Sequence, residues 1–144
     1  MNCWYLSEHE SAAMWRLYSK ADESIAIESN YQRLFDVLDG SCFVGLVDYI
    51  DYENEAIPPN NYFNALLRKR KSYGHEHELR ALYWDGSAAQ SILHPSSNEI
   101  DNNEMPDGIA KQIKLGELIL GVRIAPNADQ WFVDLISNTK GSIV

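Results

Sequence analysis

The chain alternates between short stretches with the apolar spacing of a strand and longer stretches with the apolar spacing of a helix. Apolar residues at i, i+3, i+4 and i+7 predict an amphipathic helix, and a short apolar or alternating run between turn residues predicts a strand. We therefore expect strands at 2–6, 24–29, 42–52, 77–84, 109–115 and 118–124. We expect helices at 7–21, 29–40, 61–71 and after residue 126.

Two of these helices begin with the sequence of a capping box. Ser7 is followed three residues later by Glu10, and Ser29 is followed by Gln32. In a capping box the serine side chain accepts a hydrogen bond from a backbone N–H of the first turn, and the acidic or amide side chain reaches back. Ser7 and Ser29 are therefore the predicted N-caps, and Gly40 is the predicted end of the second helix.

The order of these elements predicts an α+β protein of one domain. We expect a mixed sheet of about five or six strands with helices packed mainly on one face, because every amphipathic helix must bury its apolar stripe. A length of 144 residues fits a single domain that spans 1–144. Residues 85–107 are polar and rich in turn residues, so we expect a long surface loop there.

Charge and hydropathy exclude two classes of partner. The net charge of −9 opposes the approach of a nucleic-acid backbone. The basic run from Arg68 to Lys71 is interpreted as the end of the helix at 61–71, where cations complement the helix dipole. The longest apolar runs are far shorter than the ~20 residues of a membrane span, and no secretory signal is recognised. We expect a cytoplasmic protein that binds neither nucleic acid nor membranes.

The first chemically dense stretch lies in the predicted helix at 7–21. Trp15 and Tyr18 are three residues apart and share one helix face, where they could belong to a core or to a binding surface. An indole N–H and a phenol both need a hydrogen-bond partner when they are buried. The helix start could hold an anion, but the negative charges of Glu8 and Glu10 already complement the helix dipole.

The second dense stretch lies at residues 75–80, at the start of a predicted strand. Strand alternation places Glu76, Glu78 and Arg80 on one face. Two carboxylates so close together must be exposed, paired with a cation, or share a proton. An exposed ladder of ion pairs is one interpretation, and a pocket formed with the helix of Trp15 and Tyr18 is the other. His75 and His77 have a zinc-like spacing, but the sequence places no third ligand and we predict no metal site.

The ordered combination of motifs resembles a widespread bacterial domain family of unknown function. The matching residues are Asn2-Cys3-Trp4, Glu10-Ser11, Ala13-Met14-Trp15, Tyr18, Ser24 to Ile27, Tyr49 to Tyr52, Lys69-Arg70, Ser72-Tyr73, His75-Glu76, Glu78, Arg80-Ala81, Ala125-Pro126 and Trp131-Phe132. Ser24 stands where the family favours glycine, and His77 is not part of its pattern. The resemblance implies that longer members carry an N-terminal segment and a last strand that this chain lacks.

Three functions are compatible with these residues. The first is a small binding or assembly module with a polar and aromatic pocket and no cofactor, which leaves its status as an enzyme uncertain. The second is an NAD-dependent ADP-ribosyltransferase-like enzyme, an incomplete one, in which Glu78 would stabilise the oxocarbenium ion. The third is a partner protein in a toxin or phage-defence system. The candidate binding residues for a small-molecule ligand are Ser11, Trp15, Tyr18, Arg70, Glu76, Glu78 and Arg80.

Assembly is a separate expectation. The strand at 2–6 has neither a charge nor a proline to block its edge, and an exposed edge is a template for association. We therefore expect a homodimer with two-fold symmetry and with the N-terminal strand or its neighbour at the interface.

Overall fold

The computed structural model describes residues 1–19, 21–59, 61–84 and 108–139. Within these residues seven strands form three small sheets. The first sheet is antiparallel and has the order β1 (Asn2–Tyr5), β6 (Glu78–Tyr83), β3 (Cys42–Leu46). The second pairs β2 (Ile25–Glu28) antiparallel with β7 (Gly121–Ile124), and the third pairs β4 (Asp48–Ile50) parallel with β5 (Arg68–Arg70).

The helices are short, and most of them lie at the ends of strands. They are α1 (Ala12–Tyr18), α2 (Tyr31–Val37), α3 (Phe63–Leu66), the 3₁₀ helix η1 (Lys71–Glu76), α5 (Leu115–Leu118) and α6 (Gln130–Thr139). No helix in these ranges is long and apolar enough to cross a membrane.

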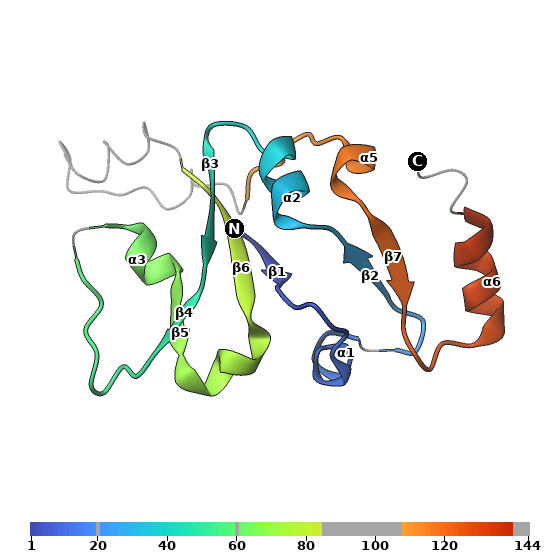
Figure 1. Cartoon of the computed structure of the whole chain (residues 1–144), viewed down its shortest axis with the longest axis horizontal. Helices are drawn as coiled ribbons and strands as arrows, with labels where there is room; N and C mark the ends of the chain where they lie inside the picture. The colour runs from blue at the N-terminus through green and yellow to red at the C-terminus, as the bar shows by residue number, and fades with distance from the viewer. Residues whose placement is uncertain (20, 60, 85–107, 140–144) are drawn as a thin grey trace.

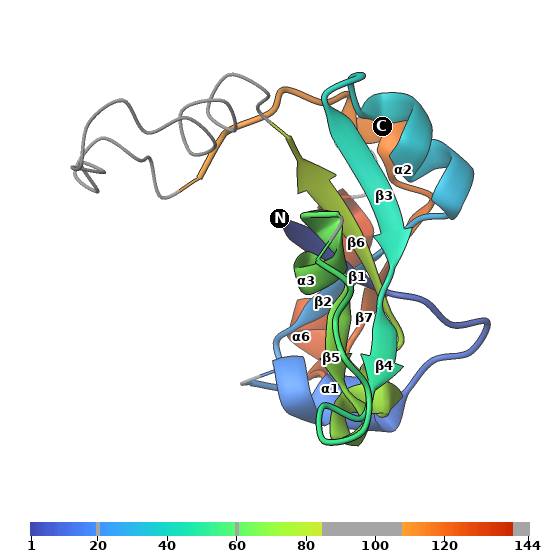
Figure 2. The same ribbon diagram turned by 90° about the vertical axis from the view of Figure 1, so that its left-hand side faces the viewer.

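Five strands lie in one row, in the order β3, β6, β1, β2, β7 (Figure 1). Figure 2 looks along this row from the β3 side, so that the strands lie one behind another. The α+β class and the single domain are confirmed. The strands number seven in the described residues and belong to three sheets: β1 and β2 are neighbours in the row but lie in different sheets, and β4 and β5 form a third.

The predicted helix starts are wrong by a few residues. Ser11, not Ser7, caps α1, and its Oγ accepts a hydrogen bond of 3.3 Å from the N–H of Met14. Asn30, not Ser29, caps α2. Ser29 instead donates its hydroxyl hydrogen to the Leu118 carbonyl, at 2.6 Å, and so ties α2 to α5. In both helices the residue that forms the cap lies nearer to the apolar stripe than the predicted serine.

The predicted helix at 61–71 is also mostly wrong. Only α3 is α-helical in this range, and the backbone then becomes extended in β5. The basic run from Arg68 to Lys71 therefore lies on a strand and at the start of η1, not at a helix end. Residues 109–114 do not form the predicted strand, and the predicted strand at 42–52 is divided into β3 and β4 at Val47. The loop expected at 85–107 lies outside the described residues.

The two faces of β6 differ in chemistry. Leu79 lies on one face in a small core with Leu34 of α2 and Leu118 of α5, and Trp4 of β1 packs against this core. Glu78 and Arg80 belong to the opposite face. Alternation along one strand therefore separates the apolar core from the charged groups, as expected for a sheet that is covered differently on its two sides.

Candidate functional site

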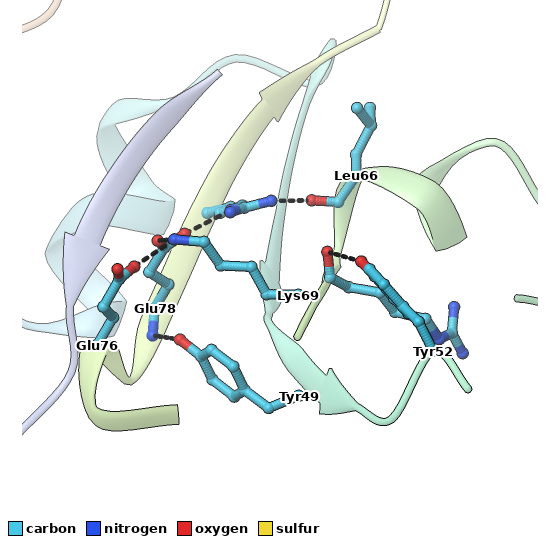
Figure 3. Close-up of polar contacts among 8 residues, drawn as sticks. Tyr49, Tyr52, Leu66, Lys69, Glu76 and Glu78 are labelled. Carbon is cyan, nitrogen blue, oxygen red and sulfur yellow. Dashed lines mark hydrogen bonds and ion pairs between the residues drawn. The ribbon is translucent and has the colours of Figure 1, made fainter. Parts of the chain in front are cut away.

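A buried cluster of four charged side chains occupies the polar face of β6. Lys69 of β5 contacts both carboxylates: its Nζ lies against Glu76 Oε2 and 2.6 Å from Glu78 Oε1. On the other side of Glu78, the Nε of Arg80 lies 2.6 Å from Oε2. Figure 3 shows Lys69 reaching from β5 between the two glutamates. Two cations therefore balance two carboxylates.

An unusual backbone conformation at His77 helps to form this cluster. His77 has a φ of 39°, in the left-handed region, and is the only described residue other than glycine with a positive φ. It ends η1 and starts the path into β6. Glu76 lies in η1 and not on the strand, so the alternation of side chains along a strand does not determine the direction of its side chain. The turn at His77 lets Glu76 and Glu78 nevertheless reach the same lysine.

Two backbone contacts hold the cluster in place. The hydroxyl oxygen of Tyr49 in β4 accepts a hydrogen bond of 2.9 Å from the N–H of Glu78. Arg80 donates through Nη1 to the carbonyl of Leu66 at the end of α3. Figure 3 shows both contacts on the side of the cluster that faces β4 and α3. The cluster therefore joins β6 to the small β4–β5 sheet.

The interpretation of Glu76, Glu78 and Arg80 as an exposed ladder of ion pairs is wrong. The exposed fractions of these residues are 7%, 7% and 8%. Burial opposes ionisation of Glu78, but its interactions within the cluster, including the hydrogen bonds that Arg80 and Lys69 donate, lower its pKa to about 2. Burial likewise opposes the charge on Lys69, but its hydrogen bonds to the two glutamates raise its pKa above the ordinary value. The Glu78 carboxylate and the Lys69 ammonium are therefore both charged at neutral pH.

A cavity of about 590 Å³ adjoins the cluster. Its wall is formed by α1 and the residues before it, by β1 and β2, and by Glu76, Glu78 and Arg123. A volume of this size falls in the range of ligand pockets. The aromatic part of the wall consists of Trp4, Tyr5, Trp15 and Tyr18, and the acidic part of Glu8, Glu10, Glu28, Glu76 and Glu78.

Five of the seven predicted site residues line this cavity: Ser11, Trp15, Tyr18, Glu76 and Glu78. The expected meeting of α1 with the start of β6 is therefore present. The Trp15 indole N–H donates to Glu10 Oε1 at 2.5 Å. Burial and the nearby Glu76 carboxylate raise the pKa of Tyr18. Arg80 is not in the wall and acts on the cavity only by holding Glu78.

Arg70 does not belong to this site. Its guanidinium lies over the ring of Tyr52, 5.9 Å from the ring centroid, and it lines a separate cavity of about 260 Å³ with residues of β4 and η1. Consecutive residues of a strand point to opposite faces, so Lys69 and Arg70 of β5 are directed apart. The predicted site residue Arg70 is therefore the chain neighbour of Lys69, the residue that reaches the cluster.

The sequence reasoning missed three participants. Lys69 was assigned to a helix end, although a strand assignment for 68–70 would have singled it out. Tyr49 comes from a strand whose pairing is not visible in local patterns. Trp4 lines the cavity, and its buried indole N–H has no hydrogen-bond acceptor within the described residues. The sequence pointed to Trp4 only through its place in the first predicted strand and in the Asn2-Cys3-Trp4 motif.

The histidine spacing leads to no metal cluster in the described parts of the chain. No three His, Cys, Asp or Glu side chains are grouped there in a way that could hold a metal ion. His77 instead packs edge-on against Tyr5, with ring centroids 6.3 Å apart.

Comparison with family models, with curated proteins and with solved structures finds no match to this chain. The resemblance to a bacterial domain family therefore stays a prediction, and the function has to be argued from the geometry of the site.

Proposed function

We propose that the chain is a binding module whose cavity between α1, β1 and β2 holds a ligand with a positively charged group beside an apolar part. The observation that carries this proposal is the composition of the cavity wall. Among the described residues of the wall there are five carboxylates, four aromatic side chains and a single arginine or lysine, Arg123. Carboxylates attract a cation, and aromatic faces add cation–π attraction to it.

The balance of charges within the wall supports this choice. Glu76 and Glu78 are already balanced by Lys69 and Arg80, and Glu28 is paired with Arg123 at 3.0 Å. Glu10 accepts the Trp15 indole N–H and lies close enough to Arg123 to help raise the pKa of that guanidinium, but it forms no ion pair with a described residue. Glu8 forms no ion pair within the described residues. Glu8 is thus left without an ion pair and Glu10 shares Arg123 with Glu28, so the described part of the wall keeps a negative charge that a cationic ligand would balance.

The geometry around Glu78 favours binding over ADP-ribosyl transfer. In that reaction a glutamate oxygen must be free to contact the ribose and to stabilise the oxocarbenium ion. Here Oε1 of Glu78 faces Lys69 and Oε2 faces Arg80, each at 2.6 Å. A substrate would have to displace the half-buried Lys69 or the buried Arg80 to reach either oxygen. ADP-ribosyl transfer therefore requires the displacement of Lys69 or Arg80 from Glu78, whereas ligand binding in the cavity does not.

A titration with two matched small molecules tests the binding module. Phenethylamine and 3-phenylpropionate share a phenyl ring but differ in the sign of their charge, and neither interferes with tryptophan emission. We expect saturable quenching or enhancement of tryptophan fluorescence with the amine and no saturable change with the acid. Equal responses to both, or a response to neither, would contradict the proposal.

Two variants locate the binding. Tyr18→Leu removes an aromatic ring from the cavity wall, and Tyr31→Leu removes an exposed ring of α2 that does not line it. We expect only Tyr18→Leu to weaken phenethylamine binding. Calorimetry with NAD serves as the parallel measurement. Binding of NAD with release of nicotinamide would favour the transferase alternative.

The module is further proposed to be cytoplasmic and to form a homodimer. The free edge of β1, where the sequence placed the interface, lies at the cavity and not at the outside of the row. The other edge of the three-stranded sheet is β3, the neighbour of β6, where Phe43 and Leu46 are exposed. We therefore place the proposed interface at β3.

A further inference from the structure

Two strand edges face the same cavity. β1 pairs only with β6, and β2 pairs only with β7, among the described strands. Residues 2–5 of β1 and 24–29 of β2 all belong to the cavity wall. In Figure 1 the two strands are neighbours, with their partners on the far sides. The cavity therefore separates two sheets that would otherwise form one row of paired strands.

The hydrogen-bond pattern identifies the backbone groups at these two edges. The N–H of Leu6 donates to the carbonyl of His77 at 2.9 Å, so these opposed residues form a hydrogen-bonded pair. In an antiparallel ladder such pairs alternate with pairs whose N–H and C=O groups point away. When this alternation is counted back along β1 from Leu6, the N–H and C=O groups of Cys3 and Tyr5 are those that point away from β6.

The same alternation of hydrogen-bonded and non-hydrogen-bonded pairs identifies the backbone groups of β2 that point away from β7. The N–H of Ala125 donates to the carbonyl of Ser24 at 2.9 Å, and these residues are opposed in the register of β2 and β7. The next residues in alternation, Ile25 and Ile27, therefore direct their N–H and C=O groups away from β7. Each edge offers two donors and two acceptors toward the space between the strands.

We propose that this space accepts an extended peptide segment of a partner protein, rich in lysine or arginine, as an added strand between β1 and β2. The proposal rests on the proposed binding function and names the class of its ligand. β1 leads down to α1 and β2 leads up to α2 in Figure 1, so the two strands run in opposite senses. An inserted strand would be antiparallel to one and parallel to the other, and a mixed sheet permits both pairings.

The added strand would pair with backbone groups that no described strand pairs with. Addition of a strand to a sheet edge gains affinity from main-chain hydrogen bonds and specificity from side-chain pockets. β1 and β2 are each four residues long, which matches about four residues of an extended ligand at about 3.3 Å per residue. Peptide carbonyls also supply a possible acceptor for the buried indole N–H of Trp4.

Charge complementarity selects the partner. In the described part of the wall, three of the five carboxylates already face cations, and Glu8 and Glu10 leave it with a negative charge that attracts a basic segment and repels an acidic one. A second copy of this chain carries a net charge of −9 and is a poor occupant for the same space. The occupant is therefore a different protein with a basic, extended segment, not another copy of the chain.

Three synthetic heptapeptides test the proposal with the full chain. The first alternates valine and lysine, Ac-VKVKVKV-amide. The second replaces each lysine by glutamate. The third keeps the lysine sequence but carries N-methyl groups on alternate residues, which removes the donors of one strand edge and leaves charge and composition unchanged. Phenethylamine is titrated in parallel, with tryptophan fluorescence as the common readout.

We expect the lysine peptide to bind saturably at concentrations up to about 1 mM, and N-methylation to weaken its binding by about tenfold or more. We expect no saturable binding of the glutamate peptide. Glu8→Gln should weaken the lysine peptide, whereas Glu23→Gln, an exposed control outside the cavity wall, should not. Bound peptide should slow hydrogen exchange at the amides of Cys3, Tyr5, Ile25 and Ile27.

Equal binding of the N-methylated peptide, or unchanged exchange at those four amides, overturns strand addition. If phenethylamine binds but the lysine peptide does not, the peptide proposal is wrong while the binding function stands. If neither binds, both are wrong.

Discussion

At the scale of single residues, the site depends on four charges that are mostly out of water. Removing a charge from water costs several kcal/mol, and this cost is offset only when the partners and hydrogen bonds are complete. Glu78 meets this condition, with a cation at each carboxylate oxygen and Tyr49 at its backbone N–H. Removal of one partner should therefore lower the free energy of unfolding by more than the intact ion pair contributes to it.

Lys69→Met tests this asymmetry. The variant keeps the length of the side chain but leaves two buried carboxylates with one cation, so we expect a loss of about 3 kcal/mol in the free energy of unfolding. Lys71→Met is the matched control, since Lys71 is exposed and lies 3.6 Å from an exposed Glu55. Its loss should stay within about 0.5 kcal/mol. Urea unfolding measures both, and equal losses would contradict the burial argument.

The pH dependence of stability gives a second prediction at this scale. The pKa of Glu78 is lowered from 4.5 to about 2 in the folded chain. Between these values the unfolded state binds more protons, so the unfolding free energy rises with pH. The contribution of Glu78 is complete above about pH 4.5 and is lost as the pH falls toward 2. Its size is of the order of 3 kcal/mol.

Glu78→Gln identifies this contribution among the other carboxylates. The variant cannot titrate at position 78, so we expect a flatter dependence of unfolding free energy on pH between about 4.5 and 2. Urea unfolding at several pH values in this window gives the slope directly. A variant slope equal to that of the unmodified chain would show that Glu78 is not held ionised by the cluster.

At the scale of elements, local sequence predicted those units whose pattern is self-contained. β1, β2 and β6 lie within the predicted strands, and α6 follows Pro126 as its amphipathic spacing indicates. The pattern failed at 61–71 because the apolar residues there suit a helix face, whereas Arg68–Arg70 is held extended by pairing with β4. Pairing between distant strands is not encoded in a local period.

The position of a helix cap is testable in the same way. Ser11→Ala removes the acceptor of the Met14 N–H and should lower the free energy of unfolding by about 1 kcal/mol. Ser7→Ala is the matched control, because the Ser7 hydroxyl accepts only from His9 within an exposed turn. Its effect should stay within about 0.5 kcal/mol. A larger loss for Ser7→Ala, in thermal or urea unfolding, would restore the sequence-based cap.

At the scale of the whole molecule, the candidate site combines elements that the sequence could only partly join. The Glu-x-Glu-x-Arg spacing predicted that Glu76 and Glu78 would be exposed, paired with a cation, or share a proton, and the structure shows the pairing with cations. The sequence did not reveal the separation of β1 from β2, because no local pattern states which strands remain unpaired. The role of Lys69 could not be predicted from the sequence for a related reason, because it depends on where β5 lies relative to β6.

The proposed homodimer is the last prediction, and it belongs to this scale. Phe43 and Leu46 of β3 are 46% and 62% exposed at the edge of the three-stranded sheet, and burying them against a second copy would remove apolar surface from water. Sedimentation at micromolar concentration should give twice the chain mass of 16.4 kDa. Added salt should strengthen association, because it screens the repulsion between copies of charge −9.

Leu46→Lys should yield monomers, whereas Leu17→Lys, an equally drastic change on the exposed face of α1, should leave the dimer intact. A monomer at every salt concentration would reject the dimer, and a dimer that survives Leu46→Lys would reject β3 as its interface.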